Sequence, residues 1–138
     1  MARILVVDDE AIVRKTIQSW LEREGFDVVC AKDGRDALAA IGASEIDVVV
    51  IDIFMPGMGG REAIRALRQR APTVPIIAIS GYMFGDTAGE EPDFLAMATD
   101  IGVAYCLQKP FRPRHLLAAV EACLGKSGTR SNDRAAGA

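Results

Sequence analysis

The sequence has few of the residues that build zinc sites or disulfide frameworks. It contains one histidine, His115, and three cysteines, Cys30, Cys106 and Cys123, which are far apart and form no C-x-x-C pair. Zinc sites and disulfide frameworks need several such residues at characteristic spacings, so neither is expected. We expect free thiols in a reducing compartment, which predicts a cytoplasmic protein.

Long apolar runs are also missing from the chain. Every apolar run falls short of the roughly 18 residues that a membrane-spanning helix needs. The apolar run at 4–7 is followed by Asp8, Asp9 and Glu10 rather than by a small-residue cleavage site. The beginning of the chain is therefore not expected to be a signal peptide, and no membrane partner is expected.

An excess of basic charge is absent as well. The 16 Lys and Arg residues are outnumbered by 19 Asp and Glu residues, and the net charge is −3. Proteins that bind nucleic acids carry basic surfaces that neutralise phosphates, so an acidic chain is not expected to bind nucleic acid directly. A length of 138 residues suits one domain with a core of its own.

What the chain does have is an alternation of apolar runs and amphipathic segments. Runs rich in Val and Ile predict five β-strands, and several are continuous, as in parallel strands buried on both faces. Helical spacing of apolar residues predicts five helices between and after them, with Gly25 ending the first, Asp33 capping the second and Pro113 beginning the last. The predicted strands are 4–7, 28–31, 48–51, 76–79 and 104–107, and the predicted helices are about 10–24, 34–43, 60–70, 93–101 and 113–124.

This order predicts a (βα)5 doubly wound α/β domain over residues 1–124. The last residues, 125–138, are small, polar and without periodicity, and we predict a disordered tail there. Too few residues lie in this tail to form a second domain.

Reactive side chains stand where the predicted strands end. The first strand is followed by Asp8 and Asp9, the third by Asp52, the fourth by Ser80 and the fifth by Lys109. Ligands of doubly wound sheets bind at the carboxyl ends of the strands, so these side chains are expected to converge. Crowded carboxylates favour a cation between them, and oxygen ligands without His or Cys favour Mg²⁺. A carboxylate nucleophile beside such cations can accept a phosphoryl group.

Taken singly, these residues have simpler explanations. Asp8 and Asp9 could cap a helix, Asp52 could stabilise a turn, Ser80 could belong to a turn, and Lys109 could be a solvated charge. Their joint placement at four strand ends favours a functional site instead.

Four sequence motifs at these strand ends resemble the receiver domains of response regulators in two-component signalling. They are VVDDE at 6–10, IDIFMPGMGG at 51–60, ISG at 79–81 and QKPF at 108–111. The resemblance covers residues 3–124. It implies a flavodoxin-like five-stranded parallel sheet with the strand order 2-1-3-4-5.

The resemblance also implies roles for the residues of the predicted site. Asp52 matches the phosphoacceptor, Lys109 the lysine that pairs with the phosphoryl group, and Ser80 the hydroxyl that bonds to it. The bond between Lys109 and Pro110 is expected to be a cis peptide.

The same resemblance implies a Mg²⁺ site. Asp9, Asp52 and the backbone carbonyl of Phe54 are the expected direct ligands, and Asp8 is expected to act mostly through water. A backbone carbonyl can be supplied by any residue, so Phe54 does not conflict with this role.

By the same resemblance, the chain is expected to be a stand-alone response regulator of the chemotaxis type. It would accept a phosphoryl group on Asp52 from a histidine kinase or a histidine phosphotransfer protein, and signal by phosphorylation-dependent binding of a downstream protein. Homodimer formation is left open. The alternative is a pseudo-receiver that binds partners without phosphorylation.

Enzyme activity beyond Mg²⁺-dependent self-phosphorylation from a phosphodonor and self-dephosphorylation is not expected. Phosphatases with an aspartate nucleophile need a second aspartate two residues later, where this chain has Phe54.

Two features depart from the receiver pattern. The position three residues before the lysine, where receivers usually carry an aromatic residue, is Cys106, and Tyr105 is expected on the opposite face of the strand. The segment between Ser80 and Lys109 is longer than expected. Its surplus, 81–91, is predicted to be a loop that is either a neutral insertion or a surface for partner binding. We hypothesise that this loop and the helix after it carry the signal.

The last predicted helix begins with an unfavourable set of charges. Arg112 stands at the N-cap position and Arg114 in the first turn, where cations cost about 1 kcal/mol of stability. We interpret these charges as part of a binding face. His115, on the same amphipathic helix, is expected at the surface.

Overall fold

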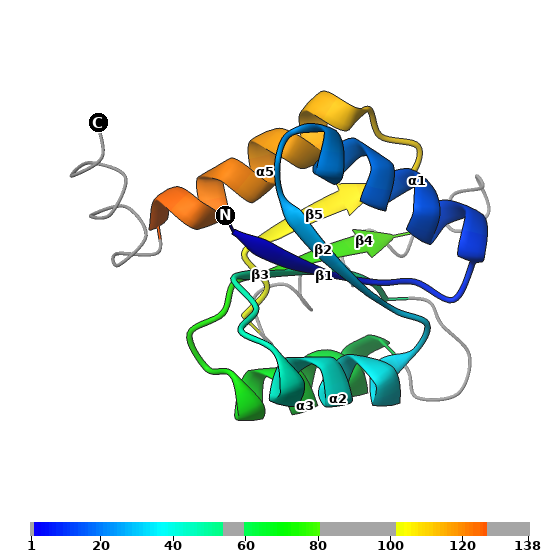
Figure 1. The fold of residues 1–138 in the computed structure, drawn as a ribbon. Helices are drawn as coiled ribbons and strands as arrows, with labels where there is room; N and C mark the ends of the chain where they lie inside the picture. Colours follow the sequence, from blue (N-terminus) through cyan, green and yellow to red (C-terminus); the bar gives the residue numbers. More distant parts are fainter. Residues whose placement is uncertain (1, 54–59, 81–101, 127–138) are drawn as a thin grey trace, which may run out of the picture.

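Five parallel strands form one sheet with helices on both faces (Figure 1). The computed structural model describes residues 2–53, 60–80 and 102–126. The strands lie in the order β2-β1-β3-β4-β5, and all neighbouring pairs are parallel. This confirms the predicted doubly wound fold and its strand order. The strands are β1 (Arg3–Val7), β2 (Asp27–Ala31), β3 (Val48–Asp52), β4 (Ile76–Ser80) and β5 (Tyr105–Gln108).

Two helices cover each face of the sheet among the described residues (Figure 1). They are α1 (Ala11–Arg23) and α5 (Pro113–Lys126) on one face, and α2 (Gly34–Ala43) and α3 (Gly60–Arg70) on the other. None of these described helices is both long and apolar enough to span a membrane. The predicted loop at 81–91 and helix at 93–101 lie outside the described residues. Helix α5 runs past its predicted end at 124, and the rest of the predicted tail, 127–138, is also outside them.

The predicted helix boundaries have the expected local causes. Gly25 follows α1 with a φ of 92°, a backbone conformation that glycine adopts without strain. The side chain of Asp33 accepts a hydrogen bond of 2.9 Å from the backbone N–H of Asp36 and so caps α2. At the start of α5, the exposed His115 accepts a hydrogen bond through Nδ1 from the backbone N–H of Arg112 at 3.3 Å. This side chain returns to the cap residue in the manner of a capping box.

The core has two layers, one on each face of the sheet. Alternate residues of each strand face opposite layers: Leu5 packs on the α2 and α3 side, and Ile4 on the α1 and α5 side. Strands β1, β3 and β4 lie between other strands and under helices on both faces, which explains their continuous apolar runs. As predicted, Tyr105 and Cys106 contact opposite layers.

The strand register determines where the polar residues meet. Val7 of β1 pairs with Ile51 of β3, so the next residues, Asp8 and Asp52, come side by side at the carboxyl edge of the sheet. Strand β3 continues through Asp52, because its backbone still pairs with Ile79 of β4. The fold therefore places two acids from distant parts of the sequence on neighbouring strand ends.

The two-layer core makes a prediction about stability. Leu116 of α5 is fully buried, and Leu116→Ala should lower the free energy of unfolding by about 2–5 kcal/mol, because it removes packed atoms and leaves a cavity. Ile12→Ala is the control. Ile12 of α1 is 80% exposed, so this substitution should change the free energy of unfolding by no more than about 0.5 kcal/mol. Urea unfolding of both variants measures the difference. Equal losses would contradict the assignment of the core.

Candidate functional site

Three aspartates meet at the carboxyl edge of the sheet. The carboxylates of Asp8, Asp9 and Asp52 each offer an oxygen atom, and these atoms all lie within 4.8 Å of one another. Asp8 and Asp52 are buried, with 1% and 4% exposure, whereas Asp9 is exposed. The structure thus brings together the three acids that the sequence placed at the ends of two separate strands.

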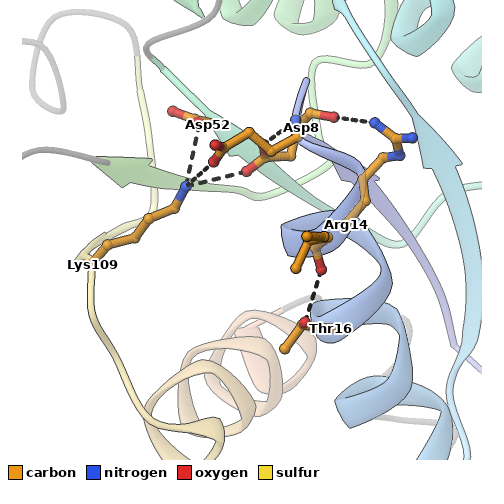
Figure 2. Close-up of polar contacts among 7 residues, drawn as sticks. Asp8, Arg14, Thr16, Asp52 and Lys109 are labelled. Atoms are coloured by element: carbon orange, nitrogen blue, oxygen red, sulfur yellow. Dashed lines mark hydrogen bonds and ion pairs between the residues drawn. The ribbon is translucent and has the colours of Figure 1, made fainter.

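Lys109 joins this cluster from the end of β5. Its Nζ atom lies 3.4 Å from Oδ2 of Asp8 and 3.5 Å from Oδ2 of Asp52, as Figure 2 shows. A longer contact of 3.9 Å reaches Oε1 of the exposed Glu10. The Lys109–Pro110 peptide is cis, as the resemblance implied. The Lys109 ammonium therefore forms ion pairs with two buried carboxylates.

Asp8 is held at both its backbone and its side chain. Its N–H donates to the carbonyl of Ala31 at 3.2 Å, and its own carbonyl accepts from Nη1 of Arg14 at 2.7 Å. Oδ1 of Asp8 accepts from the backbone N–H of Glu10 at 2.9 Å, and Oδ2 faces Lys109. Burying a carboxylate is costly unless its oxygens are hydrogen-bonded, and here both oxygens of Asp8 are.

Sequence reasoning missed the contacts of Arg14 and Glu10. One signal was present: Arg14 is the fourth residue of α1, and three acids, Asp8, Asp9 and Glu10, directly precede this helix. Helix α1 has no acidic residue in its first turn, and Glu10 at its N-cap makes no capping hydrogen bond through its side chain. A cation one helical turn after three acids was thus the signal that could have indicated a contact of Arg14 with the end of β1.

An aromatic contact links α1 to the segment that carries Lys109. Trp20 of α1 meets Phe111 edge-on, with ring centroids 6.0 Å apart and an interplanar angle of 78°. Both side chains also pack against the core layer under α1 and α5. The turn after Lys109 is therefore packed on the same helix that follows Asp8 and Asp9.

The other two predicted site residues are described only in part or not at all. Ser80 is the last residue of β4 and pairs with Gln108 of β5, so its backbone lies at the same edge of the sheet. Phe54 lies outside the described residues, and its predicted role stays a prediction.

The electrostatics of the site favour a charged lysine. Burial alone would lower the pKa of Lys109. The negative charges of Asp52 and Asp8, and the hydrogen bonds to both, raise this pKa by more than burial lowers it, so it lies above its ordinary value of 10.5. Lys109 therefore carries its positive charge throughout the physiological pH range.

The donor set fits a hard divalent cation. The three carboxylates supply oxygen ligands only, and neither His nor Cys belongs to the described cluster. Among the residues that the structure describes, the Lys109 ammonium is the one that forms ion pairs with these acids, and one positive charge does not balance three carboxylates. Mg²⁺ prefers carboxylate oxygens and would relieve this excess, so the residues present fit it.

A parallel α/β sheet with such a cluster at its carboxyl edge is suited to bind a phosphoryl group, and the comparisons with known proteins agree. Residues 4–121 match the family model described as the response regulator receiver domain. The chain therefore belongs to the response regulator receiver domain family of two-component signalling.

Individual relatives extend this result. The chain is 35% identical over 125 residues to the alkaline phosphatase synthesis transcriptional regulatory protein PhoP of Bacillus subtilis, covering 91% of this chain and 49% of PhoP. It is 36% identical over 125 residues to the response regulator MprA of Mycolicibacterium vanbaalenii, covering 91% of this chain and 51% of MprA. The chain thus spans about half the length of these curated relatives.

Solved structures give the same fold. The structure of the chemotaxis protein CheY4 of Vibrio cholerae matches with a TM-score of 0.80 and 31% identity. This match covers 90% of the present chain and 99% of the CheY4 chain. The similarity therefore includes almost all of a receiver chain.

The shared lysine leads to a prediction about alkaline pH. Lys109→Met should lower the free energy of unfolding at neutral pH by about 2 kcal/mol, because two buried carboxylates lose their cation. Since the pKa of Lys109 is raised in the folded state, its stabilisation is complete below the ordinary value of 10.5. That stabilisation is lost as the pH rises through the folded-state pKa, so parent and variant should converge there.

Urea unfolding from neutral to strongly alkaline pH measures this convergence. Lys32→Met is the control, because Lys32 forms a 3.6 Å ion pair with Asp36 at the surface. Such exposed pairs contribute about 1 kcal/mol at most. A difference between parent and Lys109→Met that does not shrink at alkaline pH would contradict the prediction.

Proposed function

We propose that the chain accepts a phosphoryl group on Asp52 from a histidine kinase or a histidine phosphotransfer protein. The observation that carries this proposal is the buried carboxylate of Asp52, with the Lys109 ammonium 3.5 Å away and two further aspartates beside it. A nucleophile, a fixed positive charge and a set of oxygen ligands are the parts that phosphoryl transfer needs.

The transfer follows from the chemistry of a carboxylate nucleophile. An oxygen of Asp52 attacks phosphorus, the bond between phosphorus and the histidine nitrogen breaks, and its electron pair stays on the imidazole. The product is an acyl phosphate on Asp52. Lys109 stabilises the charge on the phosphoryl oxygens, and attack of water on phosphorus later restores the carboxylate.

Mg²⁺ would be held by Asp9 and Asp52, with Asp8 in support. When bound, it neutralises negative charge on the phosphoryl oxygens. We retain the backbone carbonyl of Phe54 as a further ligand and Ser80 as a hydrogen-bonding partner of the phosphoryl group. Both assignments come from the sequence motifs.

We further propose that the chain works as a stand-alone receiver that binds a downstream protein when phosphorylated. The support is the match to CheY4, which covers 99% of that chain. An antibody against this domain tests it in cell extracts. A band near the size of the 138-residue chain is expected, and a band about twice that size would overturn the stand-alone arrangement.

A second candidate function rests on Cys106. This half-buried thiol packs on the α2 and α3 side of β5, at the position where receivers usually carry an aromatic residue. A protein without that aromatic residue could act as a pseudo-receiver, whose partner binding does not depend on phosphorylation. Binding of a downstream partner with and without a beryllofluoride mimic of the phosphoryl group separates the two functions.

The proposed reaction predicts a single covalent phosphate. Incubation with Mg²⁺ and a small acyl-phosphate donor should add one phosphate to the parent, as measured by intact mass. Asp52→Asn should prevent the addition, because an amide is a poor nucleophile. Asp27→Asn, a change at an exposed aspartate of β2, serves as the control and should be modified like the parent. Unchanged modification of Asp52→Asn would contradict the assignment.

The acid cluster predicts a specific response to Mg²⁺. Millimolar Mg²⁺ should raise the melting temperature of the parent. A free Mg²⁺ concentration of 100 times Kd would raise the free energy of unfolding by about 2.7 kcal/mol. Asp9→Ala should abolish this response. Without Mg²⁺, Asp9→Ala should melt above the parent, because one of three repelling charges is gone. Glu45→Ala, at an exposed site, is the control. If Mg²⁺ does not change the melting temperature of the parent, the proposed Mg²⁺ site is contradicted.

A further inference from the structure

We propose that Arg14 is a positioning residue that holds Asp9 in place for binding Mg²⁺. The inference rests on the proposed function, since it concerns the metal site that supports phosphoryl transfer. Arg14 does not contact the reacting atoms. It acts through the backbone between Asp8 and Asp9.

The contact that carries the inference is short and partly shielded from water. Nη1 of the half-buried Arg14 donates to the backbone carbonyl of Asp8 at 2.7 Å, as drawn in Figure 2. This carbonyl belongs to the peptide unit that joins Asp8 to Asp9. Because a peptide unit is planar and trans, fixing the direction of its carbonyl also fixes its N–H and the Cα atom of Asp9.

Asp9 needs such a restraint more than the other two acids. Asp8 is tied by hydrogen bonds at its backbone and at both carboxylate oxygens. The carboxylate of Asp9 is exposed and, within the described parts of the chain, has neither a hydrogen-bond nor an ion-pair partner. Repulsion from two carboxylates within 4.8 Å favours rotation of Asp9 away from the cluster. The restraint holds the backbone from which the carboxylate of Asp9 extends, so repulsion can move this carboxylate only by rotation about its own side-chain bonds.

The position of Arg14 in the helix points to the same role. Arg14 is the fourth residue of α1, one turn after Glu10 at the N-cap, and side chains of a helix lean toward its N-terminus, so Arg14 can reach back to the end of β1. The charge-assisted hydrogen bond to the carbonyl of Asp8 lies in this direction. The arginine is thus located where it reaches the turn between β1 and α1.

Electrostatics and positioning predict opposite results when the charge of Arg14 is removed. If Arg14 acted only as a nearby positive charge, its removal would strengthen Mg²⁺ binding, because one cation would no longer repel another. If it positions Asp9, its removal should weaken Mg²⁺ binding. The sign of the change in affinity therefore separates the two roles.

The experiment compares Mg²⁺ affinities by isothermal titration at constant ionic strength. Arg14→Met keeps the aliphatic stem and removes the hydrogen bond, and we expect its affinity to fall about tenfold or more. Arg14→Lys retains one donor and should recover part of the loss. The matched control is Lys15→Met, which removes an exposed charge from the next residue of α1 and should change the affinity by no more than about twofold.

Several outcomes would overturn the proposal. An Arg14→Met variant that binds Mg²⁺ as tightly as the parent, or more tightly, would do so, and so would an equal loss in Lys15→Met. Arg14→Gln, which is uncharged and shorter, decides by the same criterion if Arg14→Met does not fold. A parent that neither binds Mg²⁺ nor becomes phosphorylated overturns the proposed function as well. If the parent binds Mg²⁺ and becomes phosphorylated, and Arg14→Met binds Mg²⁺ with the affinity of the parent, only the positioning role is overturned.

Discussion

Two buried carboxylates on neighbouring strands need a positive charge between them, and the site is organised by this requirement. Asp8 and Asp52 come together because β1 and β3 are paired in a fixed register. Lys109 forms ion pairs with both carboxylates from the end of β5, which is separated from β3 by β4. These charges raise the pKa of Lys109. One lysine cannot balance three aspartates. The remaining negative charge makes the site receptive to a metal ion and, with that ion, to a phosphoryl group.

Much of this arrangement was predictable from the sequence, because parallel strands carry their function at one edge. Continuous apolar runs marked the buried strands, and the polar residue after each run marked its carboxyl end. Asp8, Asp9, Asp52 and Lys109 were found in this way, and the structure brings them together. The strand ends themselves were predicted less well. Backbone pairing continues through polar residues such as Asp52, which hydropathy does not reveal.

The supporting contacts could not be predicted, because they depend on the path of the chain between elements. Arg14 of α1 contacts the carbonyl of Asp8, six residues earlier, across the turn between β1 and α1. His115 likewise meets the backbone of Arg112 through the geometry of one turn. In both cases, the partner is a backbone group, and nothing in the sequence indicates which backbone group a side chain will meet.

The contact between Trp20 and Phe111 has a practical consequence. Trp20 is the only tryptophan in the chain, and its ring lies against the residue that follows Lys109 and Pro110. Indole fluorescence depends on the surroundings of the ring. The tryptophan emission of this protein therefore reports on the contact between α1 and the segment that follows Lys109. The chain thus contains an intrinsic optical reporter there, which makes fast kinetic measurements feasible without attaching a dye.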